Sequence, residues 1–387
     1  MEGRRPSWYE FFCGGGMARA GLGSGWDCLF ANDIDPKKAA SYAANWSDDR
    51  LRVSDVADLA ADDLPGHADL AWASFPCQDL SLAGNGAGLN GQRSGAFWAF
   101  WRLMQALIAD GRPPRAILLE NVCGVITSHK GRDFAAIIAA LVGGGYCAGA
   151  LVIDAKWFVP QSRPRLFLLA TRTEAPPAAD PDPLWHPPSL VGAVGNLAPC
   201  LKKRWVWWRL PVPAPHTMRL TDLLDEDVNP ARWHTSEYTK RLLSLMSPLH
   251  RGRVEAAVRS GGRTVGCVYR RTRVDEQGDH VQRAEIRFDD VAGCLRTPAG
   301  GSSRQTIMVV EGSTVRSRLL TPRECARLMG LPETYQLPAN DNHAYHLFGD
   351  GVVAPAVGYL AEKLLEPIIR SLPAAGARRD SPEFLPR

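Results

Sequence analysis

Residues 8–17 read WYEFFCGGGM, a short apolar run that leads into three consecutive glycines. The run has the length and composition of a buried strand, and the residues from Met17 onward favour a helix. Glycines at such a strand-to-helix turn let the backbone approach a ligand closely, although they also suit a plain tight turn. This stretch therefore predicts the first βα unit of an α/β fold, with a candidate ligand site where the strand ends.

Short apolar runs alternate with helix-length segments from residue 8 to about residue 171. The predicted strands end near Phe12, Asn32, Ser54, Ser74, Leu119, Asp154 and Thr171. The amphipathic stretches between them include residues 36–46, 96–110 and 133–142. This alternation predicts βαβ units that form a mostly parallel sheet with helices on both faces.

Acidic residues follow the second and third predicted strands. Asp33 and Asp35 come about twenty residues after the glycines, and Asp55 follows the next strand. A carboxylate in this position can bind the ribose hydroxyls of a nucleoside. Because parallel strands end at one edge of a sheet, glycines and acids together predict a nucleoside-bearing cofactor. The pattern suits a dinucleotide about as well as S-adenosylmethionine.

A cysteine and a glutamate follow two further predicted strands. Cys77 lies in the stretch ASFPCQ at 73–78, and Glu120 begins the triplet ENV at 120–122. This pairing suggests a thiol nucleophile and a carboxyl partner at one edge of the sheet. A thiol with a pKa of about 8.5 is only partly thiolate at neutral pH, so its surroundings must activate it. Taken alone, a cysteine in such a turn is more often a packing residue.

Composition sets the broad class. The chain has 387 residues, of which 45% are apolar and 22% charged, which is typical of a globular protein with room for two domains. It has no run of eighteen apolar residues and no secretory signal at the N-terminus, so we expect a cytoplasmic protein without a membrane anchor. Its nine cysteines form no CxxC pair, which favours reduced thiols and predicts no structural metal.

Proline and charge mark a change of organisation after the predicted sheet. Residues 174–188 contain six prolines and predict a linker at a domain boundary. Residues 201–316 then hold 20 Lys or Arg against 13 Asp or Glu, although the whole chain has a net charge of only +4. Such a segment suits a phosphate-backbone partner, with a solvated surface as the alternative. Within it, KKRWVWWR at 202–209 suits either a nucleic-acid surface or core packing.

Helical character returns near the C-terminus. Thr321 is a candidate N-cap of a helix over residues 321–329, with Pro322 in the first position and Glu324 completing a capping box. A last apolar helix is predicted over residues 353–369, and the residues from Pro373 onward read as a frayed tail.

Seven motifs in order resemble those of the DNA (cytosine-5)-methyltransferase family, in its bacterial restriction-modification form, over nearly the whole chain. They are FFCGGG at 11–16, NDID at 32–35, FPCQ at 75–78, ENV at 120–122, QSRPR at 161–165, LTPRECARLMGLP at 320–332 and FGDGV at 348–352. The resemblance implies an α/β fold with the Rossmann-like sheet of S-adenosylmethionine-dependent methyltransferases and a smaller, irregular target-recognition domain. It assigns residues 1–180 and 335–387 to the catalytic and cofactor-binding domain, and residues 181–334 to target recognition.

The resemblance also implies the site and its cofactor, S-adenosylmethionine. Cys77 would be the nucleophile, Glu120 would bind the base, Asn121 would orient the loop, and Arg163 and Arg165 would flank the target base. The implied cofactor contacts are Phe12, Gly14, Gly16, Asp33, Ile34, Asp55, Pro76, Asp350 and Val352. Asp350 stands where the family commonly has Asn, which raises the question of cofactor affinity.

The implied partner is double-stranded DNA. Two alternatives stay open, a companion restriction endonuclease that acts separately and an enzyme that acts alone. A monomer is the default expectation for an enzyme that reads its site asymmetrically. A Gly-rich polar loop extends from Ser81 to Arg93, and its composition is typical of a lid that closes over a site. The other candidate DNA contacts are Arg251, Arg253, Arg263, Arg270, Arg271, Arg273 and Arg304, because Arg can bind guanine edges and phosphates. Three rival interpretations are an RNA cytosine methyltransferase, a DNA-binding regulator without catalysis and a nicotinamide-dependent oxidoreductase, which explains the glycine loop alone.

Overall fold

The computed structural model describes residues 4–47, 49–76, 95–173, 179–274, 278–298 and 304–372. The chain divides into two compact units. The first unit comprises Met1–Ile153, Pro164–Pro211 and Gly358–Arg387, and the second comprises Asp154–Arg163 and Val212–Val357. The domain bounds given by the resemblance concern cofactor and target binding, and they stay a prediction.

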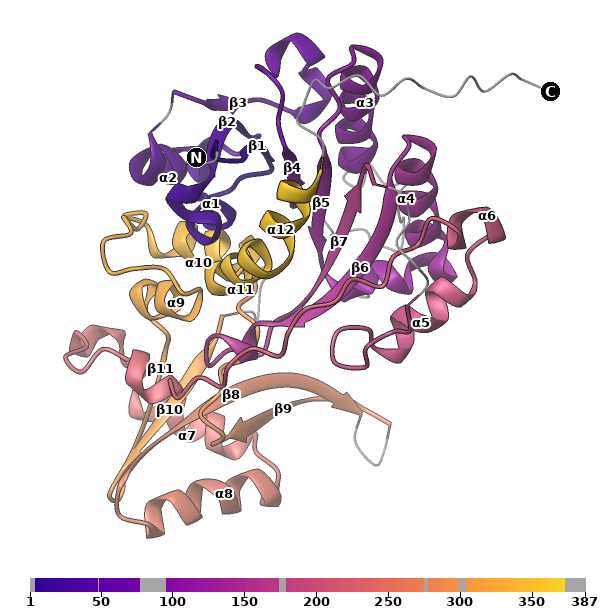
Figure 1. Ribbon diagram of the computed structural model, residues 1–387. Coiled ribbons are helices and arrows are strands. Elements are labelled where there is room, and N and C mark those ends of the chain that lie inside the picture. Colours follow the sequence, from indigo (N-terminus) through magenta and orange to yellow (C-terminus); the bar gives the residue numbers. More distant parts are fainter. Residues whose placement is uncertain are drawn as a thin grey trace. The chain divides into compact units, whose positions relative to one another are not determined.

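The first unit is built on a seven-stranded sheet in the order β3-β2-β1-β4-β5-β7-β6 (Figure 1). Its strands are β1 (Ser7–Phe11), β2 (Asp27–Asp33), β3 (Leu51–Val53), β4 (Leu70–Ala73), β5 (Ala116–Asn121), β6 (Cys147–Asp154) and β7 (Pro164–Thr171). Strands β3, β2, β1, β4 and β5 pair in parallel, and β7 runs antiparallel to β5. The order differs from the 3-2-1-4-5-6 of the Rossmann fold because β7 lies between β5 and β6.

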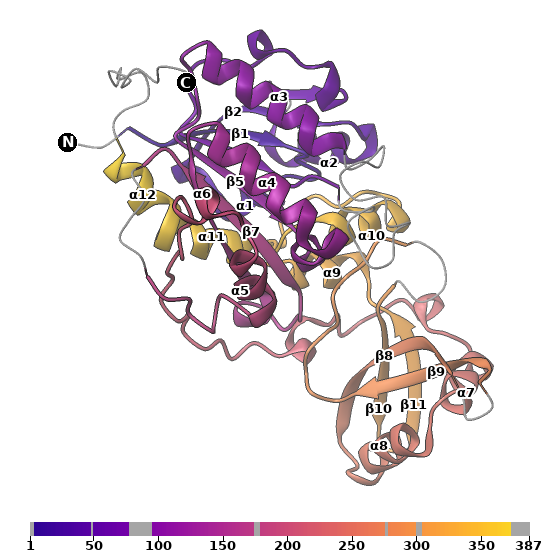
Figure 2. The same cartoon turned by 90° about the vertical axis from the view of Figure 1, so that its right-hand side faces the viewer.

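Alternate residues of the strands face opposite layers of helices, since side chains in a strand have a period of two. Tyr9, Ala71 and Ile117 share a core cluster with Phe97 of α3 and Phe134 of α4. Figure 2 turns the face covered by α3 and α4 toward the viewer. The helices of this unit are α1 (Met17–Leu22), α2 (Pro36–Trp46), α3 (Gly95–Ala109), α4 (Arg132–Gly143), α5 (Pro188–Gly195) and α6 (Pro199–Lys202).

The helical run near the C-terminus is less regular than predicted. It comprises α11 (Ala354–Leu360), a π-helical turn (Ala361–Leu365) and α12 (Glu366–Ser371). Pro367 has no backbone N–H to complete the α-helical ladder, and a wider turn before it accommodates that loss. Gly358 packs against the α1 backbone, because a Cβ at this position would lie 3.0 Å from the Gly21 carbonyl oxygen. The first unit is therefore discontinuous in sequence.

The second unit contains a four-stranded antiparallel sheet in the order β11-β10-β8-β9. The strands are β8 (Arg263–Val274), β9 (His280–Arg287), β10 (Thr306–Glu311) and β11 (Thr314–Leu319), and the helices are α7 (Ser236–Ser244), α8 (Pro248–Arg259), α9 (Pro322–Leu328) and α10 (Asp341–Asp350). A small core joins this sheet to α7 and α8 through Leu242, Val254, Val268, Ile286 and Met308.

The structure confirms the predicted fold class, a mostly parallel α/β sheet accompanied by a smaller domain. All seven predicted strand ends lie within two residues of the observed ends. The capping box at Thr321 and Glu324 is present. Core packing is the correct alternative for Trp205 and Trp208, since both are buried. Within the described part of the chain, no helix is long and apolar enough to cross a membrane.

Candidate active site

Three chain segments meet where β4 and β5 end in the first unit. Ala73 of β4 lies beside Leu119 of β5, and the antiparallel register places Glu120 opposite Phe167 of β7. The beginning of β7 therefore lies at the same edge as the ends of β4 and β5. This geometry brings residues 74–76, 120–121 and 164–165 together, although they are far apart in the sequence.

Glu120 and Arg165 point to the same face of the sheet. Arg165 lies two residues before Phe167, the residue that opposes Glu120, so the two side chains are diagonal neighbours. Arg165 Nε lies 3.3 Å from Glu120 Oε1, and the two side chains are only 13% and 6% exposed. The edge thus carries a largely buried ion pair that directs a carboxyl group and a guanidinium toward one place.

Asn121 anchors the segment that precedes Cys77. Its Nδ2 donates to the carbonyl oxygen of Phe75 at 3.1 Å, and its Oδ1 accepts from the Val122 amide at 2.9 Å. Asn121 is buried, and Phe75 belongs to the core. Phe75 lies two residues before Cys77, and the orienting role of Asn121 stays a prediction. Cys77, Ser81 and Arg93 lie outside the described residues.

The loop after β1 is held by Asp33 at the end of β2. The Gly14 amide donates to Asp33 Oδ2 and the Asp35 amide to Oδ1, each at 2.8 Å. Burial raises the pKa of Asp33, while these two amides act in the opposite direction. Each carboxylate oxygen can still accept a further hydrogen bond, so Asp33 can organise the loop and bind a hydroxyl group.

Two glycines in this loop serve different purposes. Both have left-handed backbones, with φ of +54° at Gly14 and +74° at Gly16. A Cβ at Gly14 would meet no atom of the described residues within 4 Å, whereas one at Gly16 would lie 2.2 Å from Trp46 Nε1. Trp46 in turn donates to the Gly15 carbonyl at 3.1 Å. Gly16 therefore permits the packing of α2, and Gly14 borders open space.

The remaining cofactor candidates of the first unit suit a nucleoside. Phe12 has an unusual φ of +58°, and Ile34 is an apolar side chain that is 61% exposed. Asp55 accepts from the Ala57 amide at 2.9 Å and thereby caps a short helical turn. Pro76 is exposed. Open space at a glycine, an exposed apolar side chain and carboxylates at the ends of β2 and β3 fit the nucleoside part of S-adenosylmethionine.

Arg163 belongs to the second unit and is 1% exposed. Its Nη1 donates to the Leu295 carbonyl at 2.7 Å, and its Nη2 donates to the Gly349 carbonyl at 2.8 Å. Its backbone amide donates to Asp154 Oδ1 at 2.8 Å. These bonds indicate that Arg163 positions backbone segments, and its predicted place beside the target base stays a prediction.

Gln161 works beside Arg163 and is completely buried. Its side chain donates to the Leu328 carbonyl at 2.8 Å and accepts from the Leu295 amide at 3.1 Å. The sequence analysis singled out the two arginines of QSRPR and missed this glutamine. Its signal in the sequence was an uncharged polar residue inside a motif, since such a residue needs hydrogen-bond partners if it is buried.

Asp350 and Val352 also belong to the second unit, at the end of α10 and just beyond it. Val352 is buried. The neighbouring Gly349 packs closely, since a Cβ there would lie 2.3 Å from the Thr297 amide nitrogen. The assignment of Asp350 and Val352 to the cofactor rests on the resemblance and stays a prediction.

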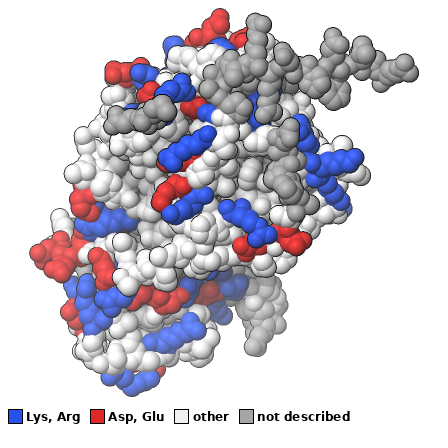
Figure 3. All heavy atoms as spheres, viewed as in Figure 1, with Lys and Arg blue, Asp and Glu red and all other residues white. Residues whose placement is uncertain are grey.

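The predicted DNA contacts of the second unit lie on two elements and near a third. Arg251 and Arg253 are on α8, the residues Arg263, Arg270, Arg271 and Arg273 are on β8, and Arg304 precedes β10. Some of them have partners in the structure, because Arg273 Nη2 lies 2.5 Å from Glu285 Oε1 and Arg253 Nη1 donates to the Ile286 carbonyl at 3.1 Å. On the face seen in Figure 3, cationic and acidic side chains are interspersed.

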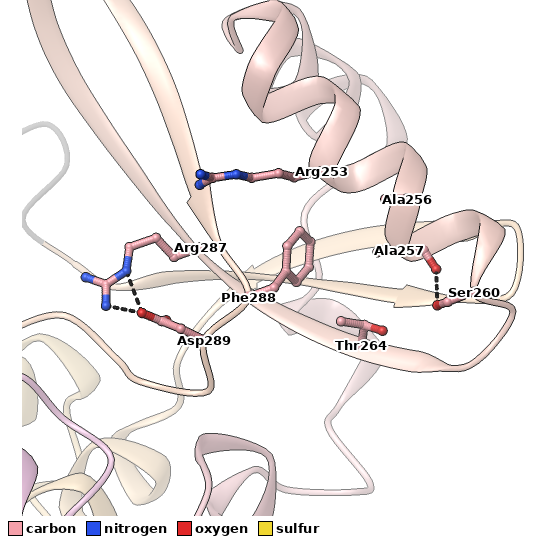
Figure 4. A pocket seen from close by; sticks show the side chains of 8 residues that line it. All are labelled: Arg253, Ala256, Ala257, Ser260, Thr264, Arg287, Phe288 and Asp289. Atoms are coloured by element: carbon pink, nitrogen blue, oxygen red, sulfur yellow. Dashed lines mark hydrogen bonds and ion pairs between the residues drawn. The ribbon is translucent and has the colours of Figure 1, made fainter.

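Arg253 borders a hollow of about 760 Å³ between α8 and the sheet. Figure 4 shows the Phe288 ring between Arg253 and Arg287 on one side and Ser260 and Thr264 on the other. Arg287 is paired with Asp289. Apolar and charged side chains line this hollow, and one of them, Arg253, is a predicted DNA contact.

A buried carboxyl group that the sequence analysis missed lies in the middle of β1. Glu10 is 1% exposed, and its Oε2 accepts from the Tyr42 hydroxyl at 3.1 Å. Burial raises the pKa of Glu10 to about 8. Its signal was a charged residue inside the apolar run WYEFF. Among the residues that the structure describes, no group of three His, Cys, Asp or Glu side chains could hold a metal ion.

Comparisons with known proteins identify a family and relatives that cover nearly the whole chain. The family model described as C-5 cytosine-specific DNA methylase matches residues 7–366. The Type II methyltransferase M.DsaV of Dactylococcopsis salina is 28% identical over 367 residues, which cover 94% of this chain and 87% of that protein. The Type II methyltransferase M.NlaX of Neisseria lactamica is 26% identical, covering 92% of this chain and 95% of that protein.

Among solved structures, the Dnmt2 methyltransferase of S. pombe has a similar fold, with a TM-score of 0.61 and 17% identity. The similarity covers 94% of this chain and 99% of that one. At this level of identity the likeness concerns the fold alone.

Proposed function

Because this chain belongs to the C-5 cytosine-specific DNA methylase family, we propose that it transfers a methyl group from S-adenosylmethionine to carbon 5 of a flipped-out cytosine within one specific duplex sequence. The observation that carries the proposal is the convergence of Glu120, Asn121 and Arg165 at the edge where the segment leading to Cys77 leaves β4. A buried carboxyl and guanidinium near the described segment 74–76, which precedes Cys77 in the sequence, suit covalent chemistry on a planar, polar ring.

S-adenosylmethionine, when bound, supplies an electrophilic methyl group on sulfur. We assign its nucleoside to Phe12, Gly14, Asp33, Ile34 and Asp55, at the ends of β1, β2 and β3. Asp33 and Asp55 carry acceptors for ribose or base donors, and Ile34 offers an apolar contact that is already exposed. Gly16 supports this part indirectly by allowing Trp46 to pack under the loop. Asp350, Val352 and Pro76 are assigned to the cofactor by resemblance.

Cys77 provides the nucleophile. Carbon 5 of cytosine is a poor nucleophile until the ring's conjugation is broken, and addition of the Cys77 thiolate to carbon 6 breaks it. The electron pair displaced by this bond moves toward ring nitrogen 3, where the acid form of Glu120 supplies a proton and neutralises the charge. Carbon 5 of the resulting enamine would take the methyl group, while the electron pair of the broken sulfur–methyl bond stays on sulfur. Loss of the carbon 5 proton to a base, elimination of Cys77 from carbon 6 and return of the nitrogen 3 proton to Glu120 then restore the aromatic ring, the thiolate and the acid.

Arg165 and Asn121 support this step. The Arg165 guanidinium lies 3.3 Å from Glu120 and can bond the carbonyl oxygen of the base, offsetting the negative charge that develops on the ring. Asn121 fixes the Phe75 carbonyl and so limits where the chain can place Cys77. Arg163 acts through the backbone segments to which it is bonded.

The cytosine must leave the duplex before Cys77 can reach carbon 6, at a cost of about a few kcal/mol. We propose that the loop bounded by Ser81 and Arg93 closes over the extruded base and that the basic second unit binds the duplex. The Type II methyltransferases among the relatives suggest a restriction-modification setting with a separate endonuclease, and we propose a monomer that reads its site asymmetrically.

Methylation sequencing of plasmid DNA tests the proposal. We expect cells that express the protein to carry 5-methylcytosine in one short motif, and cells that express Cys77→Ala to carry none. The same experiment reveals the recognition sequence. Unmodified plasmid cytosine in the presence of well-folded protein would refute the DNA reaction and favour an RNA substrate or a non-catalytic DNA-binding role.

A further inference from the structure

The second unit contains a smaller pocket that none of the family motifs explains. It has a volume of about 460 Å³. It lies between the segment 231–234, the beginning of α10 and the region of Arg304 and Leu319. This volume is within the range of about 300–1,000 Å³ that is usual for pockets that hold one small molecule. A single nucleotide therefore fits, and a duplex does not.

Two arginines lie near aromatic rings of the pocket lining. Arg304 Cζ lies 5.5 Å from the centre of the Tyr345 ring, and Arg304 Nη2 donates to Asn342 Oδ1 at 2.7 Å. Arg316 Cζ lies 4.2 Å from the centre of the ring of Trp233, which also lines the pocket. Guanidinium groups and aromatic rings are both flat, and the guanidinium groups make their surroundings cationic.

The pocket is fixed by its own hydrogen bonds. The Tyr345 hydroxyl donates to the Leu320 carbonyl at 2.6 Å, which sets the orientation of its ring. Arg232 Nη1 donates to Asp341 Oδ2 at 2.6 Å. Asn340 accepts from the backbone amides of Asn342 and His343 and so orders the first turn of α10. A ligand would meet side chains that are already positioned, which lowers the entropic cost of binding.

The chemistry of the lining selects a nucleotide. Bases stack on aromatic rings and on guanidinium planes, and the forked N–H groups of Arg match phosphate oxygens. The amide side chains of Asn340 and Asn342 can exchange hydrogen bonds with the polar edge of a base. Among the described residues that line the pocket, Asp341 is the single carboxylate, and it is paired with Arg232, so a metal ion is a poor occupant.

We propose that this pocket binds one nucleotide of the DNA substrate whose base has left the duplex stack, with the base stacked on Arg304 or Tyr345 and the phosphate bound by Arg232 or Arg304. The proposal rests on the proposed function, since it takes DNA as the substrate. The source of the nucleotide follows from position in the chain, because Arg304 ends the stretch GGSSR at 300–304 within the basic segment 201–316. The pocket would bind a nucleotide other than the cytosine that reacts.

Substitutions of Tyr345 and Arg304 test the pocket. With the duplex that the wild type methylates, Tyr345→Leu should raise the Kd about 10-fold or more, because it removes a stacking surface. Tyr345→Phe keeps the ring, and its Kd should stay within about threefold of the wild-type value.

Arg304→Ala should weaken binding and reduce the dependence of Kd on salt by about one phosphate contact, whereas Arg304→Lys should keep that dependence. Arg370→Ala on α12 is the control for loss of an exposed Arg.

Photo-cross-linking distinguishes the source of the nucleotide. Duplex that carries 5-iodo-deoxyuridine next to the methylated motif should cross-link to a peptide containing Trp233 or Tyr345. Calorimetry with the four deoxynucleoside monophosphates provides the second arm. Binding of a free monophosphate that Tyr345→Leu abolishes, together with an unchanged Kd for DNA, would overturn the DNA source.

Circular dichroism and thermal melting of each variant show whether it is folded. A folded Tyr345→Leu with wild-type Kd and no cross-link in this region would overturn the pocket, while plasmid methylation by the wild type would leave the proposed function intact. A wild type that methylates no DNA would instead refute the proposed function.

Discussion

At the scale of single residues, position in the sheet explains chemistry that the sequence could only suggest. Glu120 is 5% exposed and faces Arg165 because β7 runs antiparallel to β5. If β7 ran parallel to β5, its carboxyl end with Thr171 would lie at this edge, and Arg165 would lie at the opposite edge. The antiparallel strand therefore supplies a cation where the proposed reaction develops negative charge.

The role of Glu120 is testable by Glu120→Gln. Because an amide cannot deliver a proton to ring nitrogen 3, we expect kcat to fall about 10²- to 10⁴-fold, with a smaller change in the Kd for DNA. Single-turnover methylation of the motif found by sequencing measures this effect. Glu362→Gln, a change in an exposed residue of the same unit, is the control. A kcat within about threefold of wild type would exclude Glu120 from proton transfer.

Glu10 makes stability depend on pH. Burial raises its folded-state pKa from 4.5 to about 8. Between pH values of about 4.5 and 8 the unfolded chain has lost this proton while the folded chain keeps it, so the free energy of unfolding falls as pH rises through this range. Glu10→Gln removes that contribution, and its stability relative to wild type should increase with pH. Urea unfolding of both proteins at several pH values measures the trend, and parallel pH profiles would contradict it.

At the scale of elements, close packing fixes the cofactor loop. The turn between β1 and α1 is held by two hydrogen bonds: its Gly14 amide donates to the Asp33 carboxylate, and the Trp46 indole donates to its Gly15 carbonyl. Asp33 orders the loop from the end of β2, and Gly16 leaves room for a side chain of α2. Contacts from β2 and α2 thus determine the backbone conformation of the turn between β1 and α1.

Gly16→Ala tests this packing. The new Cβ would lie 2.2 Å from Trp46 Nε1 at a left-handed φ of +74°. We expect a lower Tm, a loss of roughly 1–3 kcal/mol in stability and weaker binding of S-adenosylmethionine. Gly25→Ala, where a Cβ would meet nothing within 4 Å, is the matched control and should behave like wild type. Equal Tm values and cofactor affinities for the two variants would refute the packing argument.

A buried ion pair secures the beginning of α9. Arg318 is 1% exposed and Glu324 is completely buried, and their two contacts are each 2.7 Å long. Glu324 also accepts from the Thr321 amide in the capping box. Removing one partner of a buried pair leaves the other charge uncompensated.

Glu324→Gln should therefore lower the free energy of unfolding by about 3–5 kcal/mol. Glu333→Gln removes an exposed partner of Arg327 and should cost about 1 kcal/mol or less. Chemical denaturation of both variants provides the comparison. Equal losses would show that the buried pair contributes no more than a surface pair does.

At the scale of the whole molecule, charge is distributed unevenly along the chain. The segment 201–316 has an excess of seven cationic residues, while the full chain has a net charge of +4. Its positive groups are interspersed with Asp and Glu on the face seen in Figure 3, and several of them form ion pairs. This arrangement suits a surface that binds phosphates selectively at a few places.

DNA binding should therefore weaken as salt is added. If about three phosphates are neutralised, Kd should rise at least about 10-fold between roughly 50 and 200 mM salt. Fluorescence anisotropy with the recognised duplex measures the slope. Binding of S-adenosylmethionine over the same range is the control and should change much less. A Kd that is independent of salt would show that phosphate contacts contribute little.

Sequence pattern predicted the large unit well because its information is local. Strand ends at Phe11, Asp33 and Ala73 follow from apolar runs that are interrupted by turn residues. The capping box at Thr321 and Glu324 is likewise a relation between residues three apart. The second unit was harder to predict, since its long strands β8 and β9 carry many charged residues and lack a clear alternation.

The sequence by itself determined the order of βα units, the family and the residue types of the site, because strand periodicity, glycine turns and motif order are written along the chain. The tertiary structure decided which of those residues meet. The antiparallel β7 places Arg165 beside Glu120, and the carbonyls of Leu295 and Gly349 surround the buried Arg163. It also assembled a nucleotide-sized pocket from Arg304, Tyr345 and the segment 231–234. These are long-range contacts, set by strand pairing and burial, which no local pattern specifies.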